Sequence, residues 1–377
     1  MVCMKGDKNV IEEKMKEVFE HMHAHPELSY EETETTSYIY DYLEGAGFSP
    51  VKFSNTTGLY CDVGNFDEGN PIIGIRADID ALFQEVDGVK QANHSCGHDA
   101  HTSMVIGTML KIKDDPALES RGVRFIFQPA EEVGTGALSV VDEGVVDDLD
   151  YFFGIHLRPI EEAVNGFAAP SIEHGAAGSV EFKIVGEDAH GARPHLNHNA
   201  IEVGTDIVNM LSKIHINPII PSSVKMTRFL AGGKSLNIIP GSAECGIDMR
   251  AQTNEQMEKL KERVFTILKN IEEIYDVKIE DMEFSGIVAS ESHQDAIDVL
   301  RNSIVDVLGE EKCLEPIITS GGDDFHYYTV KMPELKGAML GLGCDLKPGL
   351  HHPNMTFEHS ALANGAEILY QAILNVK

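Results

Sequence analysis

The chain has 377 residues, of which 42% are hydrophobic and 24% charged, a composition that excludes a disordered or fibrous protein. The 30 basic and 61 acidic residues give a formal net charge of −31, which excludes nucleic acid and an anionic membrane surface as partners. No apolar run approaches the roughly 18 residues of a membrane span, no signal peptide is visible and the six cysteines are widely spread, so we expect a cytoplasmic protein.

The first half of the chain alternates between helical and strand patterns. Apolar spacing predicts helices near 8–25, 33–47, 101–113 and 136–144. Short apolar runs bounded by turn residues predict strands at 59–64, 71–78, 123–130 and 150–157. Buried runs separated by helices are typical of an α/β fold with a mostly parallel central sheet.

The middle of the chain has a different pattern. Strands are predicted at 178–186, 222–233, 241–251 and 277–286, with helices at 199–214 and 254–276. This βαββαβ order predicts a small ferredoxin-like α+β domain over 177–288. A helix at 293–309, a strand at 337–343 and a helix at 358–377 then return to the first fold. We therefore expect one domain formed by 1–176 plus 289–377, with 177–288 inserted into it.

Potential metal ligands follow several of these predicted strands. The segment NHSCGHDAHT (93–102) leads into a helix and contains Cys96 and His98. The other donors come after apolar runs, in the order Asp78, Asp80, Glu131, Glu132, His156, His351 and His352. Because ligands of doubly wound sheets gather at the carboxyl ends of the strands, these segments are expected to meet at one edge. Isolated histidines elsewhere, namely His21, His23, His215 and His293, are expected on the surface.

The types of donor indicate a catalytic centre for two divalent metal ions. Thiolate, imidazole and carboxylate ligands suit Zn²⁺, Mn²⁺, Co²⁺ or Ni²⁺ better than Mg²⁺ or Ca²⁺. A structural zinc site uses close-set Cys and His pairs, whereas these donors are spread over the chain and include carboxylates. A second carboxylate beside a ligating one, as in Glu131–Glu132, suits a general base acting on metal-bound water.

Eight motifs occur in the order of a known family: HAHPELSYEE, IRADIDAL, SCGHDAHT, QPAEE, GIHLRP, AHGARPH, NIIPGSAECGIDMR and GLHHP. With these motifs the chain resembles the di-metal amidohydrolases that include N-acyl-amino-acid amidohydrolases, hippurate hydrolases and indole-acetyl-amino-acid hydrolases. These are relatives of aminoacylases and carboxypeptidase-type metallopeptidases. The resemblance implies a zinc-peptidase-like catalytic domain interrupted by a dimerisation domain, and therefore a homodimer, with further pairing into tetramers left open.

The resemblance also implies a role for each matching residue. The implied metal ligands are Cys96, as a bridging ligand, with His98, Glu132, His156 and His351. Glu131 matches the general base and Asp78 the residue that orients a ligating group. His190 matches a histidine that the dimerisation domain supplies from the opposite subunit. Asn237 and Arg250, expected on neighbouring strands of that domain, match substrate-binding residues.

A few positions depart from the family pattern. Leu157 and Arg158 stand where valine and tryptophan are more common, and Asp323 stands where glutamate is usual. His352 replaces a common serine, which leaves His351 and His352 as alternative ligands. We expect these changes to line the site and to alter acyl-group specificity.

The expected activity is hydrolysis of the amide bond of small N-acyl amino acids, giving a carboxylic acid and a free amino acid. A hydroxide bridging the two metals would attack the amide, with Glu131 as the general base. Two alternatives stay open. One is a dipeptidase or carboxypeptidase that uses the same two metals, and the other is a non-catalytic metal- or ligand-binding protein on the same fold.

Overall fold

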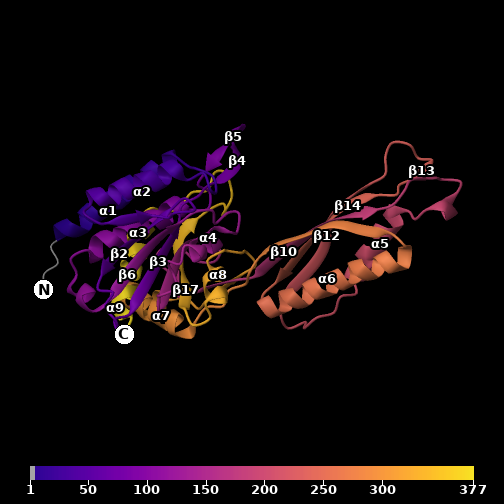
Figure 1. Cartoon of the computed structure of the whole chain (residues 1–377). Helices are drawn as coiled ribbons and strands as arrows, with labels where there is room; N and C mark the ends of the chain where they lie inside the picture. Colours follow the sequence, from indigo (N-terminus) through magenta and orange to yellow (C-terminus); the bar gives the residue numbers. More distant parts are fainter. Residues whose placement is uncertain (1–4) are drawn as a thin grey trace. The chain divides into compact units, whose positions relative to one another are not determined.

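The computed structural model describes residues 5–377, and Cys3 lies outside this range. The chain forms two compact units (Figure 1). The first contains residues 1–173, 291–318 and 323–377, and the second contains 174–290 and 319–322. The expected insertion over 177–288 falls within the second unit, which also takes a short segment from the return part of the chain.

The first unit has a seven-stranded sheet in the order β1-β2-β6-β3-β7-β17-β8. Its centre is parallel and consists of β6 (Gly122–Gln128), β3 (Ile72–Asp78), β7 (Tyr151–Pro159) and β17 (Lys336–Leu346). Antiparallel strands flank it, namely β1 (Pro50–Lys52), β2 (Leu59–Gly64) and β8 (Ala168–Ala169). Every residue of β6 is buried, as expected for a central strand covered on both faces.

Helices cover both faces of this sheet. The larger core lies against α1 (Lys5–Ala24), α2 (Thr33–Gly45), α3 (His98–Ile112), α7 (Gln294–Leu308) and α9 (Ala361–Asn375). The smaller core includes residues of α4 (Gly136–Asp142) and α8 (His326–Lys331). Successive residues of a strand point to opposite faces, so Phe153 of β7 lies in the first core and Phe152 in the second.

The second unit is a separate four-stranded antiparallel sheet in the order β12-β14-β10-β15. The strands are β10 (Ala176–Val185), β12 (Ser222–Ala231), β14 (Ala243–Ala251) and β15 (Lys278–Ile287). The helices α5 (Ala200–Leu211) and α6 (Asn254–Tyr275) lie along this sheet and share its core (Figure 1). This is the ferredoxin-like arrangement that the βαββαβ order predicts.

Short elements complete the described chain. They are β4 (Leu82–Val86), β5 (Val89–Asn93), β9 (Ile172–His174), β11 (Ala189–His190), β13 (Ile238–Ile239), β16 (Ile317–Thr319) and the 3-10 helices η1 (Pro116–Ser120), η2 (Pro194–Leu196) and η3 (Glu310–Lys312). Among the described residues, no helix is both long and apolar enough to cross a membrane. The five described cysteines are free.

Two sequence-based expectations about strands were incomplete or wrong. The β4–β5 hairpin was not predicted, although Asp87 and Gly88 both have positive φ and form the Asp-Gly turn typical of hairpins. Asn237 does not lie on a strand beside that of Arg250. It directly precedes β13, which pairs with β11, whereas Arg250 lies in β14 of the main sheet. Pro240, which lacks a backbone N–H, follows β13 directly and lies between β13 and β14.

Candidate metal centre

The predicted ligands meet beside the carboxyl ends of the parallel strands. Cys96 lies in the loop before α3, and His98 is the first residue of that helix. Glu132 follows β6 by a short loop, and His351 follows β17. His156 was expected after a strand but lies within β7, which continues to Pro159. Of these five predicted ligands, Glu132 and His351 therefore follow strands of the parallel sheet, and Cys96 and His98 lie at the start of a helix, as expected.

The loop before α3 has this shape because of Gly97. Its φ of +91° is in the left-handed region that glycine adopts without strain. A Cβ at this position would also lie 2.9 Å from Cδ1 of Leu157 on β7. Glycine thus lets the loop approach β7 closely, and Cys96 Sγ lies 3.5 Å from His156 Nε2.

The ligand atoms form two groups that share one thiol. Ligand atoms of Cys96, His98 and His156 lie within 4.8 Å of one another, and so do those of Cys96, Glu132 and His351. Neighbouring distances agree, since Glu132 Oε1 is 3.8 Å from His98 Nε2 and Glu132 Oε2 is 3.5 Å from His351 Nε2. A residue common to both groups has the position of a bridging ligand, as expected for Cys96.

Hydrogen bonds orient two of the histidines. His156 Nδ1 donates to the Leu157 carbonyl at 2.8 Å, which leaves the lone pair of Nε2 on the side of Cys96. His98 Nδ1 donates to the carbonyl and carboxylate of Asp80 at 2.9 and 3.1 Å. His98 Nε2 and Glu132 Oε1 are buried and have no hydrogen-bond partner. Unpartnered buried polar atoms carry a free-energy cost that a bound cation would remove.

Asp78 lies beside a predicted ligand, with its Oδ2 3.7 Å from His98 Nε2, but it makes no hydrogen bond to it. The residue that orients the predicted ligand His98 is Asp80, which also accepts the Glu132 N–H at 3.0 Å. Asp78 instead accepts from His101 Nδ1 at 2.7 Å and from Arg76 Nη1 at 2.5 Å. Both aspartates lie at the end of β3, but they point to different neighbours, and sequence position alone did not distinguish them.

The charges of the centre repel one another. Burial, followed by repulsion from Asp323, Glu132 and Asp324, raises the pKa of Glu131 well above its usual value. Burial is also the largest cause that raises the pKa of Glu132 to about 7 and the pKa of the Cys96 thiol well above its usual value. A cluster of buried anionic groups is stabilised by divalent cations, so the donor set fits two such ions.

The structure distinguishes the two adjacent histidines after β17. The ring of His351 belongs to the group with Cys96 and Glu132. His352 Nδ1 accepts the backbone N–H of Asn354 at 3.1 Å. Of these two residues, His351 therefore has the geometry of a ligand.

A buried residue that the sequence analysis missed holds the Glu131 loop. Ala130 has a φ of +55°, unusual for a residue with a side chain. Its N–H donates to the carboxylate of Glu32 at 2.8 Å, and Glu32 also accepts from Thr57 Oγ1 at 2.5 Å. Glu32 is the last residue of the motif HAHPELSYEE, and that motif was the available sequence signal for it. Its carboxylate is fully buried, and a charged residue is rarely fully buried without a structural role.

The remaining predicted residues lie in the second unit. His190 is the second residue of β11, and the N–H of the following Gly191 donates to the carbonyl of Asn237 at 2.8 Å, so these two segments are adjacent. Arg250 is half-exposed on β14 and donates to Asp248 at 3.0 Å.

Two of the departures from the family pattern directly follow His156 on β7. Leu157 is buried in the larger core, and Arg158 is buried with its Nε donating to Glu162 at 2.7 Å. The neighbouring predicted ligand His156 is equally buried, so the effect of Leu157 and Arg158 on acyl-group specificity stays a prediction. Asp323 does lie at the centre, within 4.8 Å of Glu131 and Asp324.

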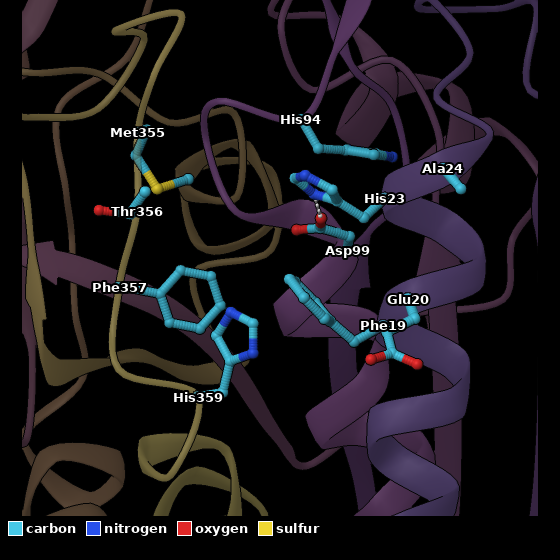
Figure 2. A pocket seen from close by; sticks show the side chains of 10 residues that line it. All are labelled: Phe19, Glu20, His23, Ala24, His94, Asp99, Met355, Thr356, Phe357 and His359. Carbon is cyan, nitrogen blue, oxygen red and sulfur yellow. Dashed lines mark hydrogen bonds and ion pairs between the residues drawn. The ribbon is translucent and has the colours of Figure 1, made fainter.

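A pocket of about 320 Å³ lies between α1 and the segment 355–359 (Figure 2). His23 and Asp99 lie on its wall, and His23 Nδ1 is 2.7 Å from the Asp99 carboxylate. His23 is exposed, as expected, but its ring also pairs with the buried carboxylate of Asp99. None of the predicted ligands, and not Glu131, lines this pocket. The chemistry expected at the metal centre therefore lies elsewhere in the first unit.

Comparisons with known proteins agree with this centre. The family model described as Peptidase family M20/M25/M40 matches residues 74–375. The chain belongs to this family. The predicted fold class and family resemblance are thereby confirmed, and the chain is a metal-dependent enzyme that hydrolyses amide bonds.

Individual relatives cover between 69% and 97% of this chain. An N-acetyl-L-cysteine deacetylase of Bacillus subtilis is 28% identical over 97% of this chain and 88% of its own length. An N-acyl-L-amino acid amidohydrolase of Geobacillus stearothermophilus is 32% identical over 69% of this chain and 73% of its own. A dinuclear metal-binding M20 peptidase of Bacillus subtilis, 26% identical, has a TM-score of 0.80 and covers 97% of this chain and 98% of its own. Together with the two donor groups, this relative supports two divalent ions in the M20 chain described here.

Proposed function

We propose that the protein hydrolyses the amide bond of N-acyl amino acids and releases a carboxylic acid and a free amino acid. The names of relatives point to this substrate class, since they include an N-acetyl-L-cysteine deacetylase and an N-acyl-L-amino acid amidohydrolase. The observation that carries the proposal is the pair Glu131–Glu132. Glu132 belongs to the donor group with Cys96 and His351, while the adjacent Glu131 lies outside both groups that contain the shared thiol and instead adjoins His98 and Glu132. A binding protein has no need of the second carboxylate, whereas a hydrolase needs a base.

The proposed ligands are Cys96, shared by both ions, with His98 and His156 on one side and Glu132 and His351 on the other. Their soft and borderline donor atoms favour Zn²⁺, Mn²⁺, Co²⁺ or Ni²⁺. When bound, such ions polarise an amide carbonyl and lower the pKa of a water molecule towards neutrality.

Glu131 would move the proton. Its carboxylate takes a proton from the attacking water and then delivers it to the leaving amine nitrogen, so that one group acts as base and then as acid. The raised pKa of Glu131, caused first by burial, suits a group that must both accept and release a proton near neutral pH. The Asp324 N–H, 3.3 Å from Glu131 Oε1, helps to orient the carboxylate.

The second unit would bind the substrate. Arg250 can pair with the carboxylate of the amino-acid part through two parallel hydrogen bonds, and Asn237 can donate to the substrate. His190 would stabilise the developing oxyanion from the opposite subunit of a homodimer. These roles follow from the family motifs AHGARPH and NIIPGSAECGIDMR.

The variant Glu131→Gln tests the role of the base. We expect two metal ions to stay bound while kcat falls about 10²- to 10⁴-fold, the usual contribution of general acid–base catalysis. Metal content is measured by elemental analysis, and turnover by amine release from N-acetyl, N-benzoyl and dipeptide substrates. The matched variant Glu132→Gln should instead lose metal. Near-normal turnover of Glu131→Gln would overturn the mechanism, and a preference for dipeptides would favour a peptidase.

A further inference from the structure

His351 differs from the other proposed ligands in how it is held. Its side chain is 54% exposed, whereas Cys96, His98 and His156 are buried. Its φ of +64° is in the left-handed region, which non-glycine residues rarely adopt without support. Packing around the side chain therefore does not fix this proposed ligand. Its position depends on hydrogen bonds that other segments make to the backbone of the loop that contains it.

That loop is closed at its base and tied at its tip. Lys347 and Thr356 exchange two backbone hydrogen bonds of 3.0 and 2.9 Å at the base. At the tip, the His351 N–H donates to the Ser95 carbonyl at 2.8 Å, and Gln84 Nε2 donates to the His351 carbonyl at 2.7 Å. Both backbone polar groups of His351 are thus bound by segments far away in sequence.

The amide of Gln84 has a fixed orientation. Its Oε1 accepts from Ser95 Oγ at 2.8 Å and from Asn93 Nδ2 at 3.1 Å. A rotated amide would place its NH2 group against the Asn93 NH2 donor and its oxygen against the His351 carbonyl oxygen, so only the observed orientation satisfies both contacts. Asn93 Nδ2 also donates to the Pro353 carbonyl at 3.1 Å, which ties the same hairpin to the same loop a second time.

These contacts join the segments that carry two ligands of one donor group. Ser95 directly precedes Cys96, and Gln84 links Ser95 to His351. We propose that Gln84 is a positioning residue that holds His351 at bonding distance from the ion shared with Cys96 and Glu132, and so sets the affinity for that ion alone. This proposal rests on the ligand set proposed above. His98 and His156 do not depend on the hairpin, because Asp80 and Leu157 orient them.

The test is the variant Gln84→Glu in the full-length protein. The carboxylate still accepts from Ser95 and Asn93 but cannot donate to the His351 carbonyl. We expect the dissociation constant of one Zn²⁺ ion, measured by competition with a chromophoric chelator, to rise about 10- to 100-fold, the usual effect of losing an orienting contact. The other Zn²⁺ should bind as before. Activity should recover at saturating Zn²⁺, which a merely misfolded protein would not do.

Gln91→Glu is the matched control. Gln91 faces Gln84 across the hairpin, is exposed and receives the same change of charge. It should leave both affinities unchanged. In the metal-free protein, amide hydrogen exchange of residues 348–355 should become faster in Gln84→Glu but not in Gln91→Glu. This measurement tests the hydrogen bond between Gln84 and the His351 loop even if zinc binding in the variant is too weak to measure.

A third variant, His351→Ala, separates the two levels of the proposal. If His351→Ala still binds two ions tightly, the ligand set itself is wrong. If His351→Ala loses one ion while Gln84→Glu binds both as tightly as the parent protein and exchanges no faster, the ligand set stands and the role of Gln84 is refuted.

Discussion

The orientation of single side chains decides whether this cluster of donors can bind metal. Sequence reasoning identified Cys96 and His98 as donors from their spacing, but it did not show which ring nitrogen would face the centre. In the structure Asp80 occupies His98 Nδ1, so Nε2 is left for an ion. Asp78, only two positions earlier, holds His101 instead. Residue types were therefore predictable, whereas their partners depend on side-chain directions that a sequence does not give.

Protonation of the centre predicts how metal affinity depends on pH. Glu132, whose burial raises its pKa to about 7, and the Cys96 thiol, whose pKa burial also raises, must release protons before they can ligate. Protons compete with the ion, so the affinity for Zn²⁺ should increase as the pH rises from 6 to 8. Calorimetric titrations in two buffers with different ionisation heats would measure the protons released. Equal affinity and no proton release across this range would contradict the assigned ligands.

The elements of the first unit were predicted where their pattern is long and regular. The buried strands β3, β6 and β7 and the helix α3 appear in the expected places because apolar periodicity reflects packing directly. The β4–β5 hairpin was missed because both strands are largely exposed and lack an apolar face. It nevertheless contributes Gln84, so the element with the weakest pattern supports a proposed ligand.

The start of α4 is predicted to tolerate no side chain. A Cβ at Gly136 would lie 1.8 Å from the Pro129 carbonyl oxygen, in the loop that leads to Glu131. Gly136→Ala must displace backbone rather than a flexible side-chain tip. We expect a loss of about 1–3 kcal/mol in the free energy of unfolding, as for other overpacked sites. Urea denaturation followed by circular dichroism measures it.

Gly45→Ala serves as the control for this substitution. Gly45 is the last residue of α2 and has open space around its Cα, so alanine should be neutral or slightly stabilising there. Equal stabilities of the two variants would show that the Pro129–Gly136 contact is not as close as described.

At the scale of the whole molecule, the proposed homodimer can be tested by mixing two inactive variants. His190→Ala chains keep Glu131, and Glu131→Gln chains keep His190. If the histidine acts across subunits, a hybrid dimer contains one centre with both residues, and some activity should return after the chains are mixed under exchanging conditions. Amine release from an N-acyl amino acid is the readout. Activity that stays at the level of the separate variants, with hybrids verified by mass, would argue for action within one subunit.

The order of the segments along the chain also affects how the protein is made. Cys96, His98, Glu132 and His156 all precede the inserted unit, whereas His351 and the strand β17 before it follow that unit. A ribosome moving at roughly 5–20 residues per second therefore exposes four donors well before the fifth, while the second unit is still being synthesised. In the nascent protein the full set of proposed ligands is therefore present only after the last quarter of the chain has been synthesised.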